Sequence, residues 1–181
     1  METMGRGRYP KTTAELTEPA DSLALQKLIA SQKKSDSCIG RGAGRSYGDS
    51  ALAPQLVGSK YLDSFLALDE ERKTLRCGSG VTLGDILQVC IPRGLFLPVL
   101  PGTKAVSVGG AIAADVHGKN HHLDGSFCAH VEQISLVLAS GEIVSCSERE
   151  NGDLFHATCG GMGLTGVIVE ATLTLDRKSV A

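Results

Sequence analysis

Residues 40 to 50 read Gly40-Arg41-Gly42-Ala43-Gly44-Arg45-Ser46-Tyr47-Gly48-Asp49-Ser50. Cys38 and Ile39 come directly before this stretch and begin a short predicted strand. Glycines at alternate positions after a strand leave successive backbone N–H groups unshielded, and such a nest attracts anions. Two interpretations stay open. Arg41 and Arg45 share the charge of a bound diphosphate, or they are solvated arginines that flank a tight turn.

The spacing of these glycines excludes the two commonest phosphate-binding motifs. After Gly42 and Gly44 the next glycine is Gly48, and no helical pattern opens there, so the dinucleotide motif G-x-G-x-x-G is not met. The P-loop motif G-x-x-x-x-G-K-[ST] occurs nowhere in the sequence. The loop therefore belongs to neither class.

A second stretch poor in large side chains lies farther along the chain. It comprises Pro101-Gly102-Thr103 and then Ser107-Val108-Gly109-Gly110-Ala111-Ile112-Ala113-Ala114-Asp115-Val116-His117-Gly118-Lys119-Asn120. Nearly every side chain from 109 to 114 is absent or a single methyl group, so the backbone can approach a broad flat object and bond the polar edge of a heteroaromatic ring. The alternative is close packing of a helix on a sheet. A third cluster, 160–166, is either a functional contact or a helix stop.

The histidines and cysteines give no signal for a metal or nucleophile. His117 and His121 are four residues apart, but no Glu follows the first His as in H-E-x-x-H, and no cysteines have metal-site spacing. We therefore predict no metal site. His117 directly follows the small-residue stretch and would face whatever that stretch holds, or else it is a structural histidine. The six cysteines are expected to be reduced and mostly buried.

The rest of the pattern predicts an α+β fold, because strands, hairpins and helices are interspersed without regular strand–helix alternation. Thr82 and Asp85 predict a capped helix start, and the proline-rich segment before residue 104 suggests a subdomain boundary. The predicted elements are a helix over 17–33, a hairpin of 65–68 and 74–77, a helix over 82–90, a hairpin of 134–138 and 142–146, a helix over 153–158 and a last strand over 167–176.

Composition excludes several classes of protein. The chain has 181 residues, 42% of them hydrophobic, with 18 Lys and Arg against 20 Asp and Glu, so one large or two small globular domains are expected and general nucleic-acid binding is not. No apolar stretch is long enough for a transmembrane segment, and no apolar region follows the basic N-terminus as in a signal peptide. The expected location is cytoplasmic, with membrane association only through a partner.

The ordered set of motifs resembles the FAD-binding domain of the vanillyl-alcohol-oxidase superfamily, also called PCMH-type. Within it the sequence is most similar to the group of decaprenylphosphoryl-β-D-ribose 2-oxidases. The residues that carry the resemblance are those quoted above together with 98–103 and 163–166, and the match runs from about residue 10 to residue 176.

The resemblance implies a two-lobed FAD-binding domain over 1–181, with mixed or antiparallel sheets, flanking helices, and subdomains over about 10–104 and 105–178. It implies that residues 40–50 hold the pyrophosphate and that Ile168 touches the adenine half. His117, Gly118 and Lys119 would face the substrate side of the flavin, which would accept a hydride from a sugar alcohol. The rest of the cofactor would be held by Gly102, Ser107, Val108, Gly109, Gly110, Ala114, Asp115, Val116 and His117.

Two departures from the family pattern shape the expectations. Related sugar oxidases carry a histidine that bonds covalently to the flavin where this chain has Arg45, so we predict dissociable FAD. The family also continues into a substrate domain, which would hold the catalytic base and the pocket for a polyprenyl-phosphate sugar. Three hypotheses follow: an oxidoreductase fragment that holds cofactor without turnover, an FAD-carrying module completed by a partner chain or another copy, and a remnant that binds nothing.

Overall fold

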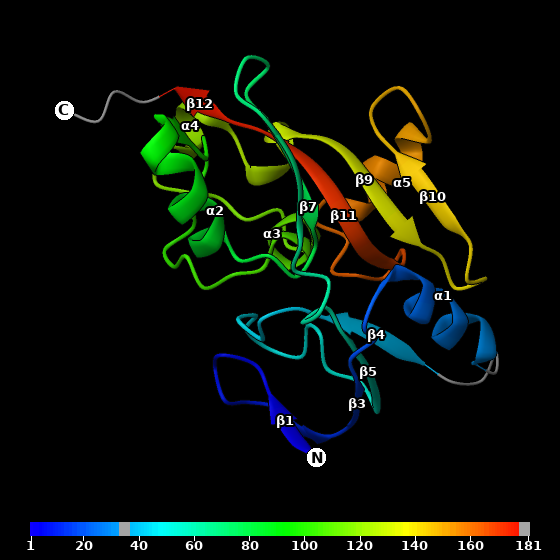
Figure 1. The fold of residues 1–181 in the computed structure, drawn as a ribbon. Helices are drawn as coiled ribbons and strands as arrows, with labels where there is room; N and C mark the ends of the chain where they lie inside the picture. The colour runs from blue at the N-terminus through cyan, green and yellow to red at the C-terminus, as the bar shows by residue number, and fades with distance from the viewer. Residues whose placement is uncertain (33–36, 178–181) are drawn as a thin grey trace.

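The structure, a computed structural model, describes residues 1–32 and 37–177 (Figure 1). The strands are β1 (Glu2–Met4), β2 (Lys11–Thr13), β3 (Glu15–Thr17), β4 (Cys38–Arg41), β5 (Gln55–Gly58), β6 (Phe65–Asp69), β7 (Thr74–Gly78), β8 (Leu95–Phe96), β9 (Val131–Val137), β10 (Ile143–Cys146), β11 (Val167–Thr174) and β12 (Asp176–Arg177). The helices are α1 (Ser22–Ser31), α2 (Leu83–Cys90), α3 (Val108–Ala113), α4 (His121–Asp124) and α5 (Gly152–Thr158), with 3₁₀ turns at Ile91–Arg93 and Phe127–His130.

The largest element is an antiparallel sheet with the strand order β10-β9-β11-β7-β6. β11 lies at its centre and pairs with β7 on one side, where Leu173 stands opposite Leu75, and with β9 on the other. β6 and β7 precede residue 104 in the chain, and β9, β10 and β11 follow it. Strand pairing therefore crosses the boundary that the proline-rich segment suggests.

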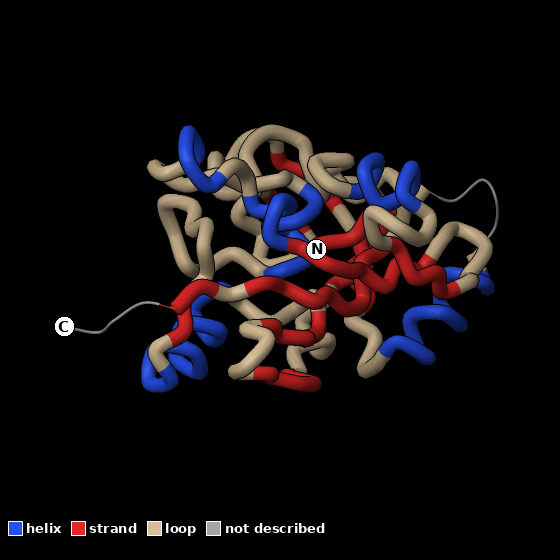
Figure 2. Tube along the Cα trace, turned by 90° about the horizontal axis from the view of Figure 1, so that it is seen from above, coloured by secondary structure: helices blue, strands red, loops and turns tan. Residues whose placement is uncertain are grey.

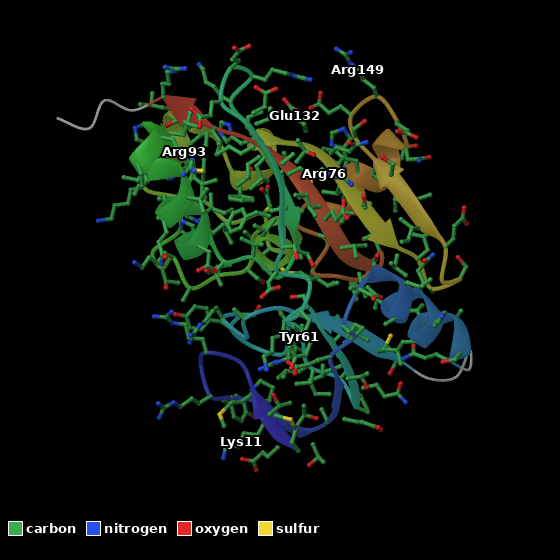
Figure 3. The ribbon with its side chains drawn as sticks, in the orientation of Figure 1. Lys11, Tyr61, Arg76, Arg93, Glu132 and Arg149 are labelled. Carbon is green, nitrogen blue, oxygen red and sulfur yellow. The ribbon has the colours of Figure 1, made fainter. Side chains whose placement is uncertain are left out.

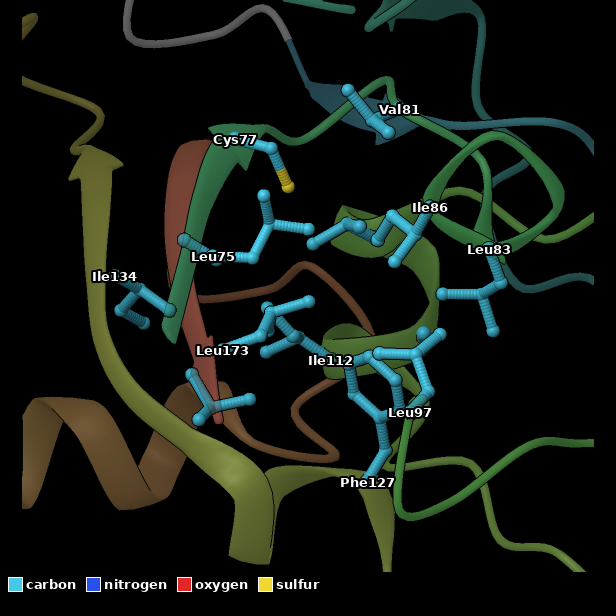
Figure 4. Packing of buried hydrophobic residues seen from close by; sticks show 14 of the residues in the cluster. Leu75, Cys77, Val81, Leu83, Ile86, Leu97, Ile112, Phe127, Ile134 and Leu173 are labelled. Atoms are coloured by element: carbon cyan, nitrogen blue, oxygen red, sulfur yellow. The ribbon is translucent and has the colours of Figure 1, made fainter. Parts of the chain in front are cut away.

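One face of this sheet forms the main hydrophobic core. Alternate side chains of β7, β9 and β11, including Leu75, Ile134 and Leu173, are fully buried against α2 and α3. In Figure 4, Leu75 and Leu173 lie close to Ile112 of α3, with Phe127 below Ile112. α2 begins with the predicted capping box, in which the Thr82 hydroxyl accepts from the Asp85 N–H and the Asp85 carboxylate accepts from the Thr82 N–H. The core therefore fixes α3 on the inner face of the sheet.

Away from α1, the opposite face of the sheet is polar. Arg76 on β7 lies on it (Figure 3), and its guanidinium donates to the Glu170 carboxylate on β11, with Nε 3.0 Å from Oε2. The Arg76 side chain is 56% exposed, so this ion pair contributes at most about 1 kcal/mol. The predicted alternation over 167–176 holds only in part, because a register shift between Ile168 and Glu170 places Ile168 in the main core and Val169 in the core beside α1.

A smaller layer is built from the N-terminal third of the chain. β3, β5 and β4 form a parallel three-stranded sheet, and β1 and β2 form an antiparallel pair. These strands make up the lower part of the molecule in Figure 1. From above, strands run through the middle of the molecule with helices on both sides (Figure 2). α1 joins the layers, since its Leu25 and Ile29 share a core with Val57, Val137 and Val169.

The predicted α+β class, both predicted hairpins, the helix over 153–158 and the last strand are confirmed. The predicted start of the first helix is wrong. Thr17 belongs to β3 and pairs with β5, and α1 begins at Ser22 because the Asp21 carboxylate caps it by accepting from the Ala24 N–H at 2.7 Å. Lys33 and Lys34, at the predicted end of this helix, lie outside the described residues.

None of the helices within residues 1–32 and 37–177 combines the length and the apolar character that a membrane span requires.

Candidate cofactor site

A cavity of about 680 Å³ lies against the loop after β4, the small residues of α3 and the first residues of β11. This volume is in the range of sites for small molecules and cofactors. Among the described residues that line it, Arg6, Arg41 and Arg45 are the only charged ones, so the cavity wall holds three cations and no carboxylate. Such a wall favours an anionic ligand.

Residues 42–47 of the loop after β4 line this cavity. Within the described part of the chain, none of the N–H groups of residues 42–48 has a hydrogen-bond acceptor. A Cβ atom at Gly42 would collide with the Ser107 hydroxyl, and Gly44 has φ +67°, in the left-handed region that favours glycine. Gly42 thus lets the loop lie directly against α3, and the loop amides have no partner within the described residues, as an anion nest requires.

Arg41 is a structural part of this loop. Its guanidinium donates to the Ala51 carbonyl oxygen at 3.0 Å and to the Met4 carbonyl oxygen at 2.8 Å. Desolvation by partial burial lowers the pKa of Arg41, yet an arginine remains charged at neutral pH. The interpretation of Arg41 as a solvated arginine is therefore wrong, whereas Arg45 is exposed.

The small-residue stretch packs closely against a neighbouring segment and also lines the cavity. It forms a short helix, α3, whose start is capped by the Ser107 hydroxyl, which accepts from the Gly110 N–H at 3.4 Å. The Gly109 N–H donates to the Ser79 carbonyl oxygen at 2.8 Å, and a Cβ at Gly109 would lie 3.0 Å from Ser79 Cβ. Close packing accounts for Gly109, while Gly110 and Ala113 line the cavity without a bulky side chain.

The histidines after α3 form a chain of ring contacts. The ring centroids of His117 and His121 are 5.2 Å apart, and both rings have a nitrogen near the Gly118 carbonyl oxygen. Across residues 1–32 and 37–177, no three His, Cys, Asp or Glu side chains are grouped as metal ligands.

All six cysteines are free thiols, and three of them are buried. Burial raises the pKa of Cys77 to about 12, so this thiol stays protonated at neutral pH and is a poor nucleophile.

Comparison with known proteins identifies the family of the chain and its cofactor. The family model described as FAD binding domain matches residues 13–147, three quarters of the chain. The chain belongs to this family of FAD-binding domains. FAD is therefore its cofactor, and its relatives are flavin-dependent oxidoreductases.

Two relatives show what share of a longer protein the FAD-binding domain matches. It is 38% identical to decaprenylphosphoryl-beta-D-ribose oxidase of Mycolicibacterium smegmatis, over 98% of this chain and 40% of that protein. It is 31% identical to L-gulonolactone oxidase of Mus musculus, over 92% of this chain and 38% of that protein. The chain thus spans about two fifths of the length of these relatives.

The residues that line the cavity of the FAD-binding domain fit the cofactor. FAD carries a diphosphate bridge, which suits three arginines and a loop of free amides. It also carries a flat ring system, which needs a wall without bulky side chains, as Gly110, Ala113 and Ala114 provide. The predicted site residues that line the cavity are Gly40, Arg41, Gly42, Ala43, Gly44, Arg45, Ser46, Tyr47, Ser50, Gly102, Ser107, Gly109, Gly110, Ala114, Val116 and Ile168.

The other predicted site residues of the FAD-binding domain do not line this cavity. Val108 is fully buried in the main core, and the Asp115 carboxylate accepts from the Cys128 N–H at 2.9 Å. His117 is exposed and directly follows Val116, which does line the cavity. The remaining residues outside the lining are Gly48, Asp49, Gly118 and Lys119.

Sequence reasoning missed part of the cavity lining of the FAD-binding domain. Gly163 and Gly166 line it, so the third glycine cluster, whose role was left open, does reach the site. Arg6 and Ser79 belong to no motif. Arg6 reaches the cavity because its N–H donates to the Ser46 carbonyl oxygen at 2.8 Å, which fixes the N-terminal segment against the glycine loop. No local pattern could have found a contact between segments 40 residues apart.

Proposed function

We propose that this FAD-binding domain serves an oxidoreductase that oxidises an alcohol carbon of a polyprenyl-phosphate sugar. The observation that carries the proposal is the cationic cavity with its free loop amides, in a chain that is 38% identical to a decaprenylphosphoryl-beta-D-ribose oxidase over 98% of its length. FAD supplies the acceptor for the hydride that leaves the alcohol carbon. The substrate pocket and catalytic base are contributed by a further domain or by a partner chain.

In this proposal residues 1–181 form one FAD-binding unit, with subdomains over about 10–104 and 105–178. Residues 40–50 hold the diphosphate. The arginines of the cavity wall balance the negative charge of the diphosphate. A diphosphate needs such cations because burying an unpaired charge is costly.

The same proposal assigns the remaining predicted residues. Gly102, residues 107–110 and residues 114–117 contact the rest of FAD, and Ile168 contacts the adenine half. His117, Gly118 and Lys119 face the substrate side of the flavin. The exposed position of His117, directly after the cavity residue Val116, supports this last assignment.

Added FAD is expected to stabilise the apoprotein. A ligand that binds only the folded state contributes about 2.7 kcal/mol at a free concentration of 100 times Kd. For a domain of this size that corresponds to a rise in Tm of about 5 to 10 °C. The measurement is thermal unfolding of apoprotein with increasing FAD, and riboflavin, which lacks the diphosphate, serves as the control. A Tm that does not rise with FAD contradicts the proposed cofactor site.

The flavin is expected to be dissociable, because Arg45 stands where related sugar oxidases carry the histidine that bonds to FAD. Acid precipitation of the loaded protein should leave the yellow colour in the supernatant. A denaturing gel should show no flavin fluorescence on the protein band. Colour that stays with the precipitate would overturn the interpretation of Arg45.

A further inference from the structure

The hydroxyl group of Ser79 is buried without a hydrogen bond. Ser79 is 1% exposed, it lines the cavity, and its Oγ is the one buried side-chain oxygen or nitrogen within the described residues that has no partner. A buried hydroxyl that stays unpaired destabilises a protein by about 1–3 kcal/mol. Buried polar groups in folded proteins are nearly always paired, so this one requires an explanation.

Two hydrogen bonds hold the backbone of Ser79 in place. Its N–H donates to the Val169 carbonyl oxygen at 2.8 Å, and its carbonyl oxygen accepts from the Gly109 N–H at 2.8 Å. The residue is therefore pinned between β11 and the start of α3. The Ser79 Cβ lies 3.0 Å from the place where a Cβ at Gly109 would stand, so this side chain packs directly against the start of α3.

The other serine at the start of α3 is already used by the protein. The Ser107 hydroxyl caps α3 by accepting from the Gly110 N–H. Ser79 has no comparable structural role for its hydroxyl, and it reaches the cavity wall directly beside Gly109, which also lines the cavity. A molecule bound in the cavity can therefore provide the hydrogen-bond partner that the Ser79 hydroxyl lacks.

We propose that the Ser79 hydroxyl forms a hydrogen bond with bound FAD and that it is a cofactor-binding residue outside all the glycine motifs. The inference rests on the proposed function, since it takes FAD as the molecule in the cavity. A hydroxyl that is unpaired in the apoprotein and paired in the FAD-bound protein lowers the stability of the apoprotein but strengthens the binding of FAD. Its removal relieves the apoprotein of an unpaired polar group and deprives FAD of a contact.

The test is Ser79→Ala. We expect the Tm of the apoprotein to equal or exceed that of the wild type. We expect the Kd for FAD, measured by quenching of flavin fluorescence, to rise about 5- to 10-fold, which corresponds to one net hydrogen bond. Both are binding or stability measurements, so neither depends on catalytic turnover.

The matched control is Ser147→Ala, which makes the same chemical change far from the cavity lining. The Ser147 hydroxyl accepts from the N–H groups of Arg149 and Glu150 at 3.3 and 3.1 Å, so its loss should lower the Tm of the apoprotein and leave the Kd for FAD unchanged. An unchanged Kd in Ser79→Ala overturns the inference and leaves the proposed function standing, as does an apoprotein of Ser79→Ala that is less stable than the wild type. Wild-type protein that fails to bind FAD overturns both.

Discussion

Gly44→Val protein is expected to purify without FAD, with an affinity at least about 100-fold below that of the wild type. Gly44 has φ +67°, and a β-branched residue held there costs about 1–3 kcal/mol of strain. The new Cβ would also stand 2.9 Å from Arg41 Nη2, in a guanidinium that two carbonyl oxygens hold in place. Titration of apoprotein with FAD, followed by flavin fluorescence, measures the loss.

Gly48→Ala separates backbone strain from the filling of space. Gly48 lies in the same loop with φ +64°, but a Cβ there has open space around it, with nothing within 4 Å. The substitution should cost about 1 kcal/mol of stability and change the Kd for FAD only a few-fold. Equal loss of flavin from Gly48→Ala and Gly44→Val would show that strain alone matters. FAD retained by Gly44→Val would remove the loop from the cofactor site.

Local signals in the sequence were sufficient for several elements of the fold. The capping box of Thr82 and Asp85 and the alternation over β11 each lie within a few neighbouring residues. The charged turn between β6 and β7 is equally local. In these segments the preferred local conformation and the packed conformation agree, so the pattern predicts the element.

The arrangement of these elements depends on contacts that no short window contains. The sheet joins β7 to β11, and Arg76 thereby meets Glu170, 94 residues later. A boundary near residue 104 is a reasonable prediction from prolines, but strand pairing is chosen by which apolar faces fit together across the whole chain. The same holds for Arg6, which reaches the cavity only because β1 and the glycine loop are neighbours in space.

The glycine motifs indicated where the cavity lies but not what each glycine does there. Gly42 is needed because the Ser107 hydroxyl occupies the place of its Cβ, and a Cβ at Gly109 would lie only 3.0 Å from Ser79 Cβ. Each of these glycines permits one segment to approach another, and the cavity lies where three such segments meet. Arg41, beside them, holds the loop through backbone carbonyl groups rather than standing free. The sequence shows which positions lack a side chain, whereas only the structure shows which atoms lie where the side chain would be.

Gly80→Ala is expected to destabilise the protein by about 3 kcal/mol, because the added methyl group meets backbone atoms that cannot move aside. A Cβ at Gly80 would collide with the Ser59 carbonyl oxygen and lie 3.0 Å from the Leu62 carbonyl oxygen, to which the Gly80 N–H already donates. Ser59 lines the cavity, and its N–H donates to the Arg41 carbonyl oxygen at 3.0 Å. A shift of Ser59 is therefore transmitted to the glycine loop, so FAD affinity should fall together with stability.

Gly84→Ala is the matched comparison four residues later. Gly84 lies in α2, where a Cβ would make ordinary contacts with Lys104 at 3.4 to 3.5 Å, and alanine is favoured over glycine within a helix by about 0.5–1 kcal/mol. Thermal unfolding of the two apoproteins should show a Tm about 6–12 °C below wild type for Gly80→Ala and one equal to or above it for Gly84→Ala. Equal Tm values for the two variants would mean that the backbone around Ser59 and Leu62 moves aside at little cost. The contact between Gly80 and this backbone would then not hold the glycine loop in place.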